Sequence, residues 1–161
     1  MSEMYTFVKF DDIEGESKTK GYEGWIGVLY LSRIITNVPL ISQETGSWSG
    51  GKGQISDFTL HLNYDKSITA IEQYCLKGKH IPKTEIHMLH TTGNDVPTLW
   101  SKYVLTNTFI TAVNSGSPSD SVIQVIIKPQ KIDFSYSPVD YTGKPAASVT
   151  WIWDAQTKEI Q

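Results

Sequence analysis

The sequence predicts a mainly β protein, a two-sheet β-barrel or sandwich of roughly eight to nine strands with one flanking α-helix. Three observations lead to this prediction. Apolar and polar residues alternate with a period of two along most of the chain, clusters of turn-forming residues separate the alternating runs, and a single segment has helical spacing. The 161 residues contain neither an internal repeat nor a linker, so we expect one domain that spans 1–161.

The alternation is clearest in ISDFTLHLNY at 55–64, where Phe58, Leu60 and Leu62 alternate with polar side chains. Because successive side chains of a strand point to opposite faces, this run predicts a strand with one dry face and one polar face. Other runs rich in β-branched and aromatic residues predict further strands. These expected strands are 25–32, 85–89, 100–113, 122–128, 131–136 and 149–153. Turn-forming residues gather between strands at 92–95, 114–120 and 140–145.

One segment, at about 66–77, is expected to be the helix. Ile68, Ile71 and Cys75 recur at helical spacing, and Gly78 follows as a C-terminal stop. We expect this helix to cover an opening in a mostly antiparallel sheet system, with Ile71 on its buried side.

The composition argues against several classes of partner. The net charge is −3 and the 14 Lys and Arg residues are scattered, which argues against a nucleic-acid-binding groove. No apolar run approaches the roughly 20 residues of a membrane span, so no membrane insertion is expected. The first residues lack the basic and apolar regions of a secretory signal, which predicts a protein that begins in the cytoplasm. The single cysteine, Cys75, excludes an internal disulfide.

Two stretches are near-matches to binding motifs. In FDDIEGESKTKGYEGWIGV at 10–28, an EF-hand register from Asp12 places Ser17 where glycine is required, and a register from Phe10 begins on a phenylalanine. In GSWSGGKG at 46–53, Gly53 replaces the magnesium-binding hydroxyl of a P-loop, and a strand is expected where the phosphate cradle needs a helix. We therefore expect no metal, no nucleotide and no other cofactor.

Histidines and tryptophans raise two further possibilities. His87 and His90 lie three apart on an expected strand and so face opposite sides, which argues against a zinc site shared with His61. Trp151 and Trp153 share one face of their strand, as a sugar-binding platform would require, but core packing is the simpler interpretation. No catalytic constellation remains, so the sequence predicts no enzyme.

Seven stretches, taken in order along the chain, resemble one family. They are GES at 15–17, GYEGWI at 21–26, the Gly/Ser run at 46–53, DKS at 65–67, GKHIP at 78–82, DFSYSPVDYTGK at 133–144 and WD at 153–154. This ordered set strongly resembles the haemolysin-coregulated protein (Hcp) family, the tube subunits of bacterial type VI secretion systems. The similarity covers nearly the whole chain, and its spacings fit the expected elements.

The resemblance implies a two-sheet β-barrel subunit that assembles as a homohexameric ring. In the family, rings stack into a tube that a contractile sheath drives out of the cell together with spike proteins, and the lumen holds small secreted effectors. The chain is thus expected to be projectile, effector carrier and chaperone in protein secretion and virulence, and to leave the cell without a signal peptide. The resemblance implies no cofactor.

Three sets of candidate site residues follow from the resemblance. Residues 37–53 are expected to form a long loop that reaches the adjacent subunit, with an interface formed by Leu40, Ile41, Trp48, Gly50, Gly51, Lys52 and Gly53. The charged turn near residues 14–23 is expected where rings meet, with the stacking residues Glu14, Glu16, Lys18 and Lys20. The end of the strand after Val28 is expected to line the lumen through Ser32 and Arg33. The charge of Arg33 departs from the aromatic-Ser-aromatic pattern common in the family.

Other interpretations remain open from the sequence. A monomeric carbohydrate-binding β-sandwich would need an exposed row of aromatic side chains, and a zinc-dependent hydrolase would need three converging ligands. A solvated surface loop is the alternative interpretation of the charged turn, because exposed charges contribute little binding energy.

Overall fold

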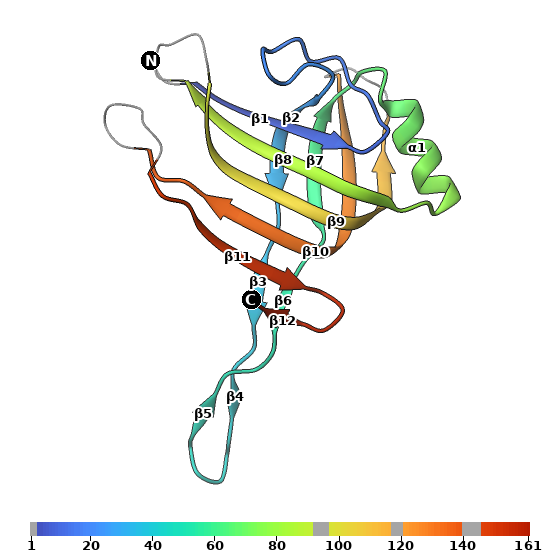
Figure 1. The fold of residues 1–161 in the computed structure, drawn as a ribbon. Coiled ribbons are helices and arrows are strands. Elements are labelled where there is room, and N and C mark those ends of the chain that lie inside the picture. The colour runs from blue at the N-terminus through green and yellow to red at the C-terminus, as the bar shows by residue number, and fades with distance from the viewer. Residues whose placement is uncertain (1–2, 92–96, 117–120, 140–145) are drawn as a thin grey trace.

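The computed structural model describes residues 3–91, 97–116, 121–139 and 146–161 (Figure 1). The elements in chain order are β1 (Glu3–Phe10), β2 (Ile26–Ser32), β3 (Ile35–Asn37), β4 (Leu40–Ile41), β5 (Trp48–Ser49), β6 (Gly53–Ile55), β7 (Phe58–Asn63), α1 (Ile68–Lys77), β8 (Ile81–Thr91), β9 (Thr98–Asn114), β10 (Val122–Tyr136), β11 (Val149–Asp154) and β12 (Glu159–Ile160). The expected turns at 92–95 and 140–145, and the end of the turn at 114–120, lie outside the described residues.

The long strand β10 closes the main sheet into a barrel. That sheet has the order β12-β11-β10-β7-β2-β1-β8-β9, and β9 also pairs with β10. On one edge of β10, residues 122–127 pair with β7 and residues 131–136 pair with β11, while β9 follows the other edge throughout. The strands β7, β2, β1, β8, β9 and β10 therefore form a closed ring of backbone pairing, from which β11 and β12 extend as a flap (Figure 1). The predicted fold class, a mainly β barrel with a flanking helix, is confirmed.

The prediction of separate strands at 122–128 and 131–136 was wrong, because both belong to β10. Pro129 falls where the neighbour on one edge of β10 changes from β7 to β11. A strand tolerates a residue without a backbone N–H most readily where its ladder is interrupted. Pro129 therefore marks the point at which the partner of β10 changes from β7 to β11, and it does not end the strand in a turn.

The inside of the barrel is the hydrophobic core. Phe58, Leu60 and Leu62 of β7 are fully buried, as their alternation predicts. Side chains from the surrounding strands complete the cluster, among them Val8, Phe10, Ile26, Ile86, Leu105, Val125, Ile127 and Ile132. Burying each large side chain of this kind contributes about 1.5–3 kcal/mol, so the core stabilises the barrel at every strand.

The helix α1 packs beside β9 and closes one side of the barrel (Figure 1). Ile68 and Ile71 are buried, and Cys75 packs against the core. Gly78 ends the helix with a φ of 63°, and its N–H donates to the Cys75 carbonyl oxygen. The predicted helix, including the face that it buries, is confirmed. No helix within the described ranges has the length and apolar character needed to cross a bilayer.

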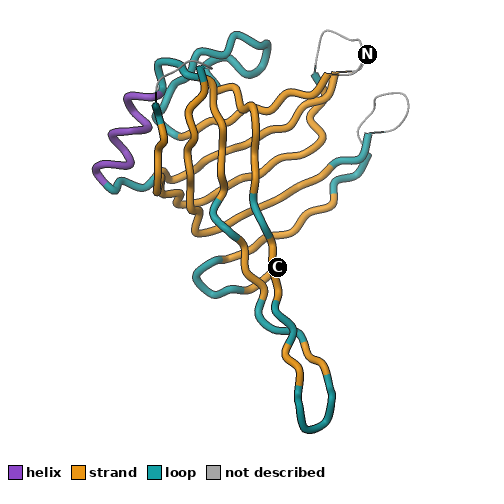
Figure 2. The backbone as a smooth tube through the Cα atoms, turned by 180° about the vertical axis from the view of Figure 1, so that it is seen from behind, coloured by secondary structure: helices purple, strands orange, loops and turns teal. Residues whose placement is uncertain are grey.

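Between β2 and β7 the chain leaves the barrel as an extended hairpin, residues 34–56, here called the arm (Figures 1 and 2). β3 pairs with β6 at its root, and β4 pairs with β5 near its tip. The tip is closed by two backbone hydrogen bonds, from Ser42 N–H to Ser47 O at 2.9 Å and from Gly46 N–H to Ser42 O at 2.8 Å. The predicted long loop at 37–53 is therefore a hairpin, because its two halves pair with each other.

A small aromatic cluster lies outside the main core and fastens the connection between β1 and β2 to the barrel. Phe7, Trp25 and Leu89 are its buried members. The ring of Tyr22 stacks on Phe7 with centroids 5.1 Å apart, and its hydroxyl lies 2.9 Å from Nδ1 of His87. The His87 ring also lies 4.7 Å from the Trp25 ring, so the imidazole is enclosed by aromatic side chains.

Burial lowers the pKa of the His87 imidazole below its ordinary value, with Glu85 opposing the shift and Lys102 and Lys83 adding to it. The folded protein therefore favours neutral His87. In the unfolded chain the same imidazole has the ordinary histidine pKa of about 6.5. The resulting stabilisation is complete above that pH and is lost as pH falls from there toward the folded pKa.

Ile71→Asp is expected to lower the free energy of unfolding by roughly 3 kcal/mol or more, because the new carboxylate would be buried without a partner. Urea unfolding followed by circular dichroism measures this. Gln73→Asp, on the exposed side of the same helix, is the matched control and should change the value by less than about 0.5 kcal/mol. If Ile71→Asp unfolds at the wild-type midpoint, the assigned helix face is wrong.

His87→Phe is expected to make the protein less sensitive to mild acid, because it removes a group that resists protonation in the folded state. Free energies of unfolding measured from about pH 7 to about pH 5 should fall less steeply for His87→Phe than for the wild type. Titrating carboxylates contribute equally to the pH dependence of the wild type and of His87→Phe. The difference between the two curves therefore reports the titration of His87. Parallel curves would show that His87 titrates alike in the folded and unfolded states.

Candidate functional site

The tip of the arm presents apolar side chains to solvent. Leu40 is 61% exposed, Ile41 53% and Trp48 70%. Ile41 lies opposite Trp48 in the register of β4 and β5, and Leu40 lies opposite Ser49. Large apolar side chains that gather on an exposed surface often mark a contact site for another molecule. The structure thus places Ile41 and Trp48 side by side on one face of the tip and Leu40 on the other face, and all three predicted interface residues are exposed.

A side-chain clip holds the middle of the arm. Asn37 Nδ2 donates to the Gly51 carbonyl at 2.8 Å, and the Gly51 N–H donates to Asn37 Oδ1 at 3.0 Å. A Cβ on Gly51 would collide with the carbonyl oxygen of Val38, so a glycine is required there. Gly50 has open space around it, and Lys52 is exposed. Of these predicted interface residues, Gly51 is therefore explained by the arm itself, without a neighbouring subunit.

The near-P-loop at 46–53 is the returning half of the arm. It contains β5 and enters β6, and the next element is β7. A phosphate cradle needs converging N–H groups at the start of a helix. The strand predicted after Lys52 is present, so the segment lacks the geometry of a nucleotide site.

A groove of about 360 Å³ separates the root of the arm from the β11–β12 flap. Its lining is mostly apolar and consists of Ile35, Gly53, Gln54, Ile55, Trp151, Trp153 and Ile160. Trp151 and Trp153 pack against the core and also line this groove, so the core-packing interpretation holds only in part. A sugar site needs several polar groups placed around its aromatic rings, which this lining does not supply.

Ser32 and Arg33, the predicted lumen residues, point to opposite faces at the end of β2. Leu31 packs against the core, so Ser32 points outward by strand alternation, toward the face that Tyr30 occupies. The Arg33 side chain returns to the core side, where its Nε donates to the Tyr103 hydroxyl at 3.0 Å. Burial raises the pKa of the Tyr103 phenol and Arg33 opposes that shift. The two residues therefore do not form one surface.

The charged turn is tied to the segment before α1. Glu16 Oε2 accepts a hydrogen bond from the Lys66 N–H at 3.0 Å, and the Glu16 N–H donates to Asp65 Oδ2 at 3.3 Å. Glu14 Oε1 lies 3.8 Å from Lys66 Nζ in an exposed ion pair, which contributes little free energy. Two of the four predicted stacking residues thus have partners within their own chain.

Lys18 and Lys20, the other two, are exposed on the same turn, and neither forms an ion pair with the residues that the structure describes. The turn itself is compact. The Gly15 N–H donates to the Gly24 carbonyl at 2.7 Å, and a Cβ on Gly15 would lie 2.5 Å from the Trp25 carbonyl oxygen. The glycine at position 15 is therefore required by close backbone approach.

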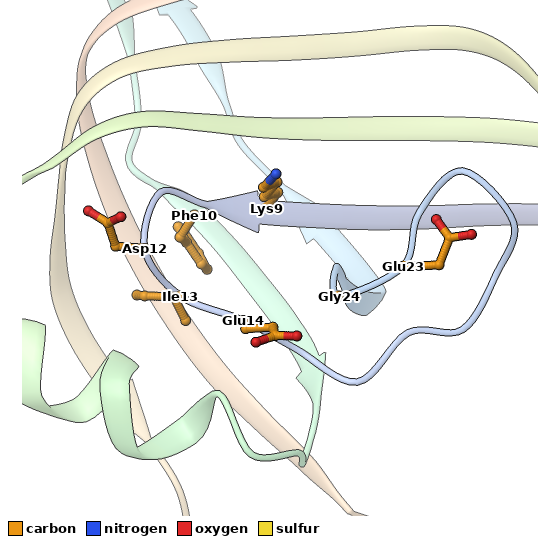
Figure 3. A pocket seen from close by; sticks show the side chains of 7 residues that line it. All are labelled: Lys9, Phe10, Asp12, Ile13, Glu14, Glu23 and Gly24. Atoms are coloured by element: carbon orange, nitrogen blue, oxygen red, sulfur yellow. The ribbon is translucent and has the colours of Figure 1, made fainter.

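Figure 3 shows a pocket of about 420 Å³ beside this turn. It is lined by Lys9, Phe10, Asp12, Ile13, Glu14, Glu23 and Gly24. The three carboxylates come from separate positions along the connection and do not converge (Figure 3). Throughout the described ranges, no group of three or more His, Cys, Asp or Glu side chains is placed to hold a metal ion. The acidic stretch therefore lacks the geometry of a calcium loop.

The three histidines considered for a zinc site, His61, His87 and His90, occupy separate settings. His87 is enclosed by the aromatic cluster, His61 packs edge to face on Tyr30 with centroids 5.4 Å apart, and His90 lines another pocket with Trp100. A zinc hydrolase needs such side chains to converge on one point. Within the part of the chain that the structure describes, they do not.

A family model matches most of the chain, and solved structures share its fold. The family model described as "Type VI secretion system effector, Hcp" matches residues 7–142. Among solved structures, a type six secretion system protein superposes with a TM-score of 0.86 at 20% identity, covering 99% of this chain and 100% of that chain. An Hcp protein from Salmonella typhimurium gives 0.77 at 22% identity, with 98% and 99% covered. A type VI secretion system effector from Yersinia pestis gives 0.68 at 23% identity, with 92% and 98% covered.

No curated protein matches the chain. At identities of 20–23% the solved structures show a shared fold. The family model goes further, because it spans most of the chain and includes the stretches GES at 15–17, GYEGWI at 21–26 and GKHIP at 78–82. The chain belongs to the Hcp family of type VI secretion system proteins.

Proposed function

We propose that this chain builds the inner tube of a type VI secretion machine: six copies close into a ring, rings stack, and the tube leaves the cell with small effectors in its lumen. The arm is the observation that carries this proposal. It extends away from the barrel and ends in an apolar tip that its own chain leaves exposed (Figure 2). A structural role in secretion, and no enzymatic activity, fits the family to which the chain belongs.

The arm supplies one side of the proposed ring contact. A ring forms when one patch on each subunit binds a different patch on the next, and rotational symmetry closes the series. The proposed arm surface comprises Leu40, Ile41, Trp48, Gly50, Gly51, Lys52 and Gly53. Leu40, Ile41 and Trp48 supply apolar area, whereas Gly51 keeps the arm narrow.

The charged turn lies at the end of the subunit opposite the arm (Figure 1), so the proposed stacking contact is separate from the proposed contact within the ring. The proposed stacking residues are Glu14, Glu16, Lys18 and Lys20. Lys18 and Lys20 are the stronger candidates, since Glu14 and Glu16 already have partners near Lys66. Such contacts depend on salt, because exposed charges are screened.

The outer face of β2 and β7 is the proposed lumen surface. Ser32 lies opposite Thr59 in their register, and Tyr30, 58% exposed, packs on His61 nearby. Arg33 was predicted for the same surface, but its side chain turns to Tyr103 on the core side, so the proposed lumen surface does not include it. Exposed Leu29 and Tyr30 of β2 add apolar area near this surface, and we propose that small effectors bind there.

The proposed partners are further copies of the chain, the sheath and spike proteins of the machine, and small effectors. The protein is proposed to act first in the cytoplasm and to be secreted without a signal peptide. A carbohydrate-binding monomer is the second candidate, and only the partly exposed Trp151 and Trp153 favour it.

Six-membered rings are expected at micromolar concentration, because the apolar arm surface favours association over a solvated monomer. Sedimentation velocity or native mass spectrometry measures the mass directly. Glycan binding by a strictly monomeric protein would instead support the carbohydrate-binding module and contradict the tube proposal.

Shortening Ile41–Gly51 to a tight turn is expected to convert rings into monomers while the circular dichroism spectrum remains rich in β structure. The double variant Leu40→Ser/Trp48→Ser should raise the midpoint concentration for ring assembly by about tenfold or more, since each loses buried apolar area. Leu76→Ser, which changes an 86% exposed leucine on α1, is the matched control. If the shortened protein and the double variant both assemble at the wild-type midpoint concentration, as the control should, the arm is not part of the interface.

A further inference from the structure

Arg33 stands between β2 and the root of the arm and contacts three aromatic rings of the barrel. Its guanidinium carbon lies 5.5 Å from the ring centroid of Tyr103, 5.8 Å from that of Phe134 and 5.8 Å from that of Trp151. Its Nε also donates to the Tyr103 hydroxyl at 3.0 Å. These rings belong to β9, β10 and β11, so one side chain joins the arm root to three strands.

The aromatic rings form a firm platform for this cation. Tyr103 and Phe134 have centroids 4.8 Å apart, and Phe134 and Trp151 have centroids 5.6 Å apart. Tyr103 is only 4% exposed, and the other two rings pack against the core. A planar guanidinium attracts the faces of several rings at once and donates a directed hydrogen bond, which an ammonium group on a flexible stem cannot reproduce.

The arm has few other ties to the barrel. The hydrogen bonds at its root, from Ile34 N–H to Ser56 Oγ at 2.7 Å and from Ser56 N–H to Ile34 O at 2.8 Å, join its two strands to each other. Beside that root lies the open apolar groove, and Ile55 is the arm residue that packs against the core. The direction of the arm relative to the barrel therefore depends on the strands that continue into it and on the few side chains at its root.

We propose that Arg33 is an anchor that fixes the direction of the arm relative to the barrel. Arg33 fixes the arm within a single subunit, whether or not the subunit assembles. The effect of this anchor on ring assembly rests on the proposed function. An arm already held in one direction loses less conformational freedom when it binds a neighbour, and this favours the ring. Arg33 is thus a positioning residue.

The test reads arm motion in the monomer. A fluorescent label on Gln43→Cys at the arm tip, in a Cys75→Ser background, is followed by time-resolved anisotropy at nanomolar concentration. Arg33→Ala and Arg33→Lys should each increase, by about twofold, the fraction of anisotropy lost faster than overall tumbling. The control Lys128→Ala removes an exposed charge elsewhere on the barrel, and a label on Gln73→Cys reports the helix instead of the arm.

Three outcomes decide the proposal. Faster arm motion in both Arg33 variants, with the helix label and Lys128→Ala unchanged, supports the anchor. Unchanged arm motion in Arg33→Ala, or equal loosening at the arm and helix labels, overturns it. If Arg33→Ala does not fold, Tyr103→Phe removes only the hydrogen-bond acceptor and should give a smaller increase. Sedimentation of the same variants tests assembly separately: chains that never form rings contradict the proposed function and leave the anchor result standing.

Discussion

The structure depends on β10 having different neighbours along its two halves. One half completes the barrel with β7, and the other half holds the β11–β12 flap, while β9 runs beside both. The flap supplies Trp151 and Trp153, and these form one wall of the groove at the arm root. Closure of the barrel, the platform under Arg33 and the placement of the arm are consequently parts of one hydrogen-bonded arrangement. A defect near Pro129 would affect all three.

The sequence predicted the elements whose pattern is set by one-sided burial. The alternation of Phe58, Leu60 and Leu62 located β7, and the spacing of Ile68 and Ile71 located α1 and its buried face. It did not predict that β10 is continuous, because a proline normally signals a break, and only the change of partner strand accommodates it. It also missed β1, an eight-residue strand that pairs with β2, the next strand along the chain, and with β8 far downstream.

For the candidate site, the sequence located the arm but not its form. Residues 37–53 have too few apolar positions for a strand pattern, so pairing between β3 and β6 and the Asn37–Gly51 clip were not foreseeable. Arg33 was assigned to the lumen by its place after β2, whereas its contacts with Tyr103 depend on strands far along the chain. A glycine or a charge that stands out in a sequence can serve its own subunit, as Gly51 and Glu16 do, and is no direct sign of a partner.

The register of the barrel also determines when the protein can fold during its synthesis. Glu3 of β1 pairs with Thr91 and Phe10 pairs with Thr84, so the first strand waits for a partner encoded far downstream. The ring of strands closes only after β10 has followed β9, and pairing over such distances folds slowly. The arm emerges from the ribosome long before that barrel exists, with its apolar tip exposed. Apolar surface exposed on an unfinished chain favours aggregation, which is the hazard that chaperones counter.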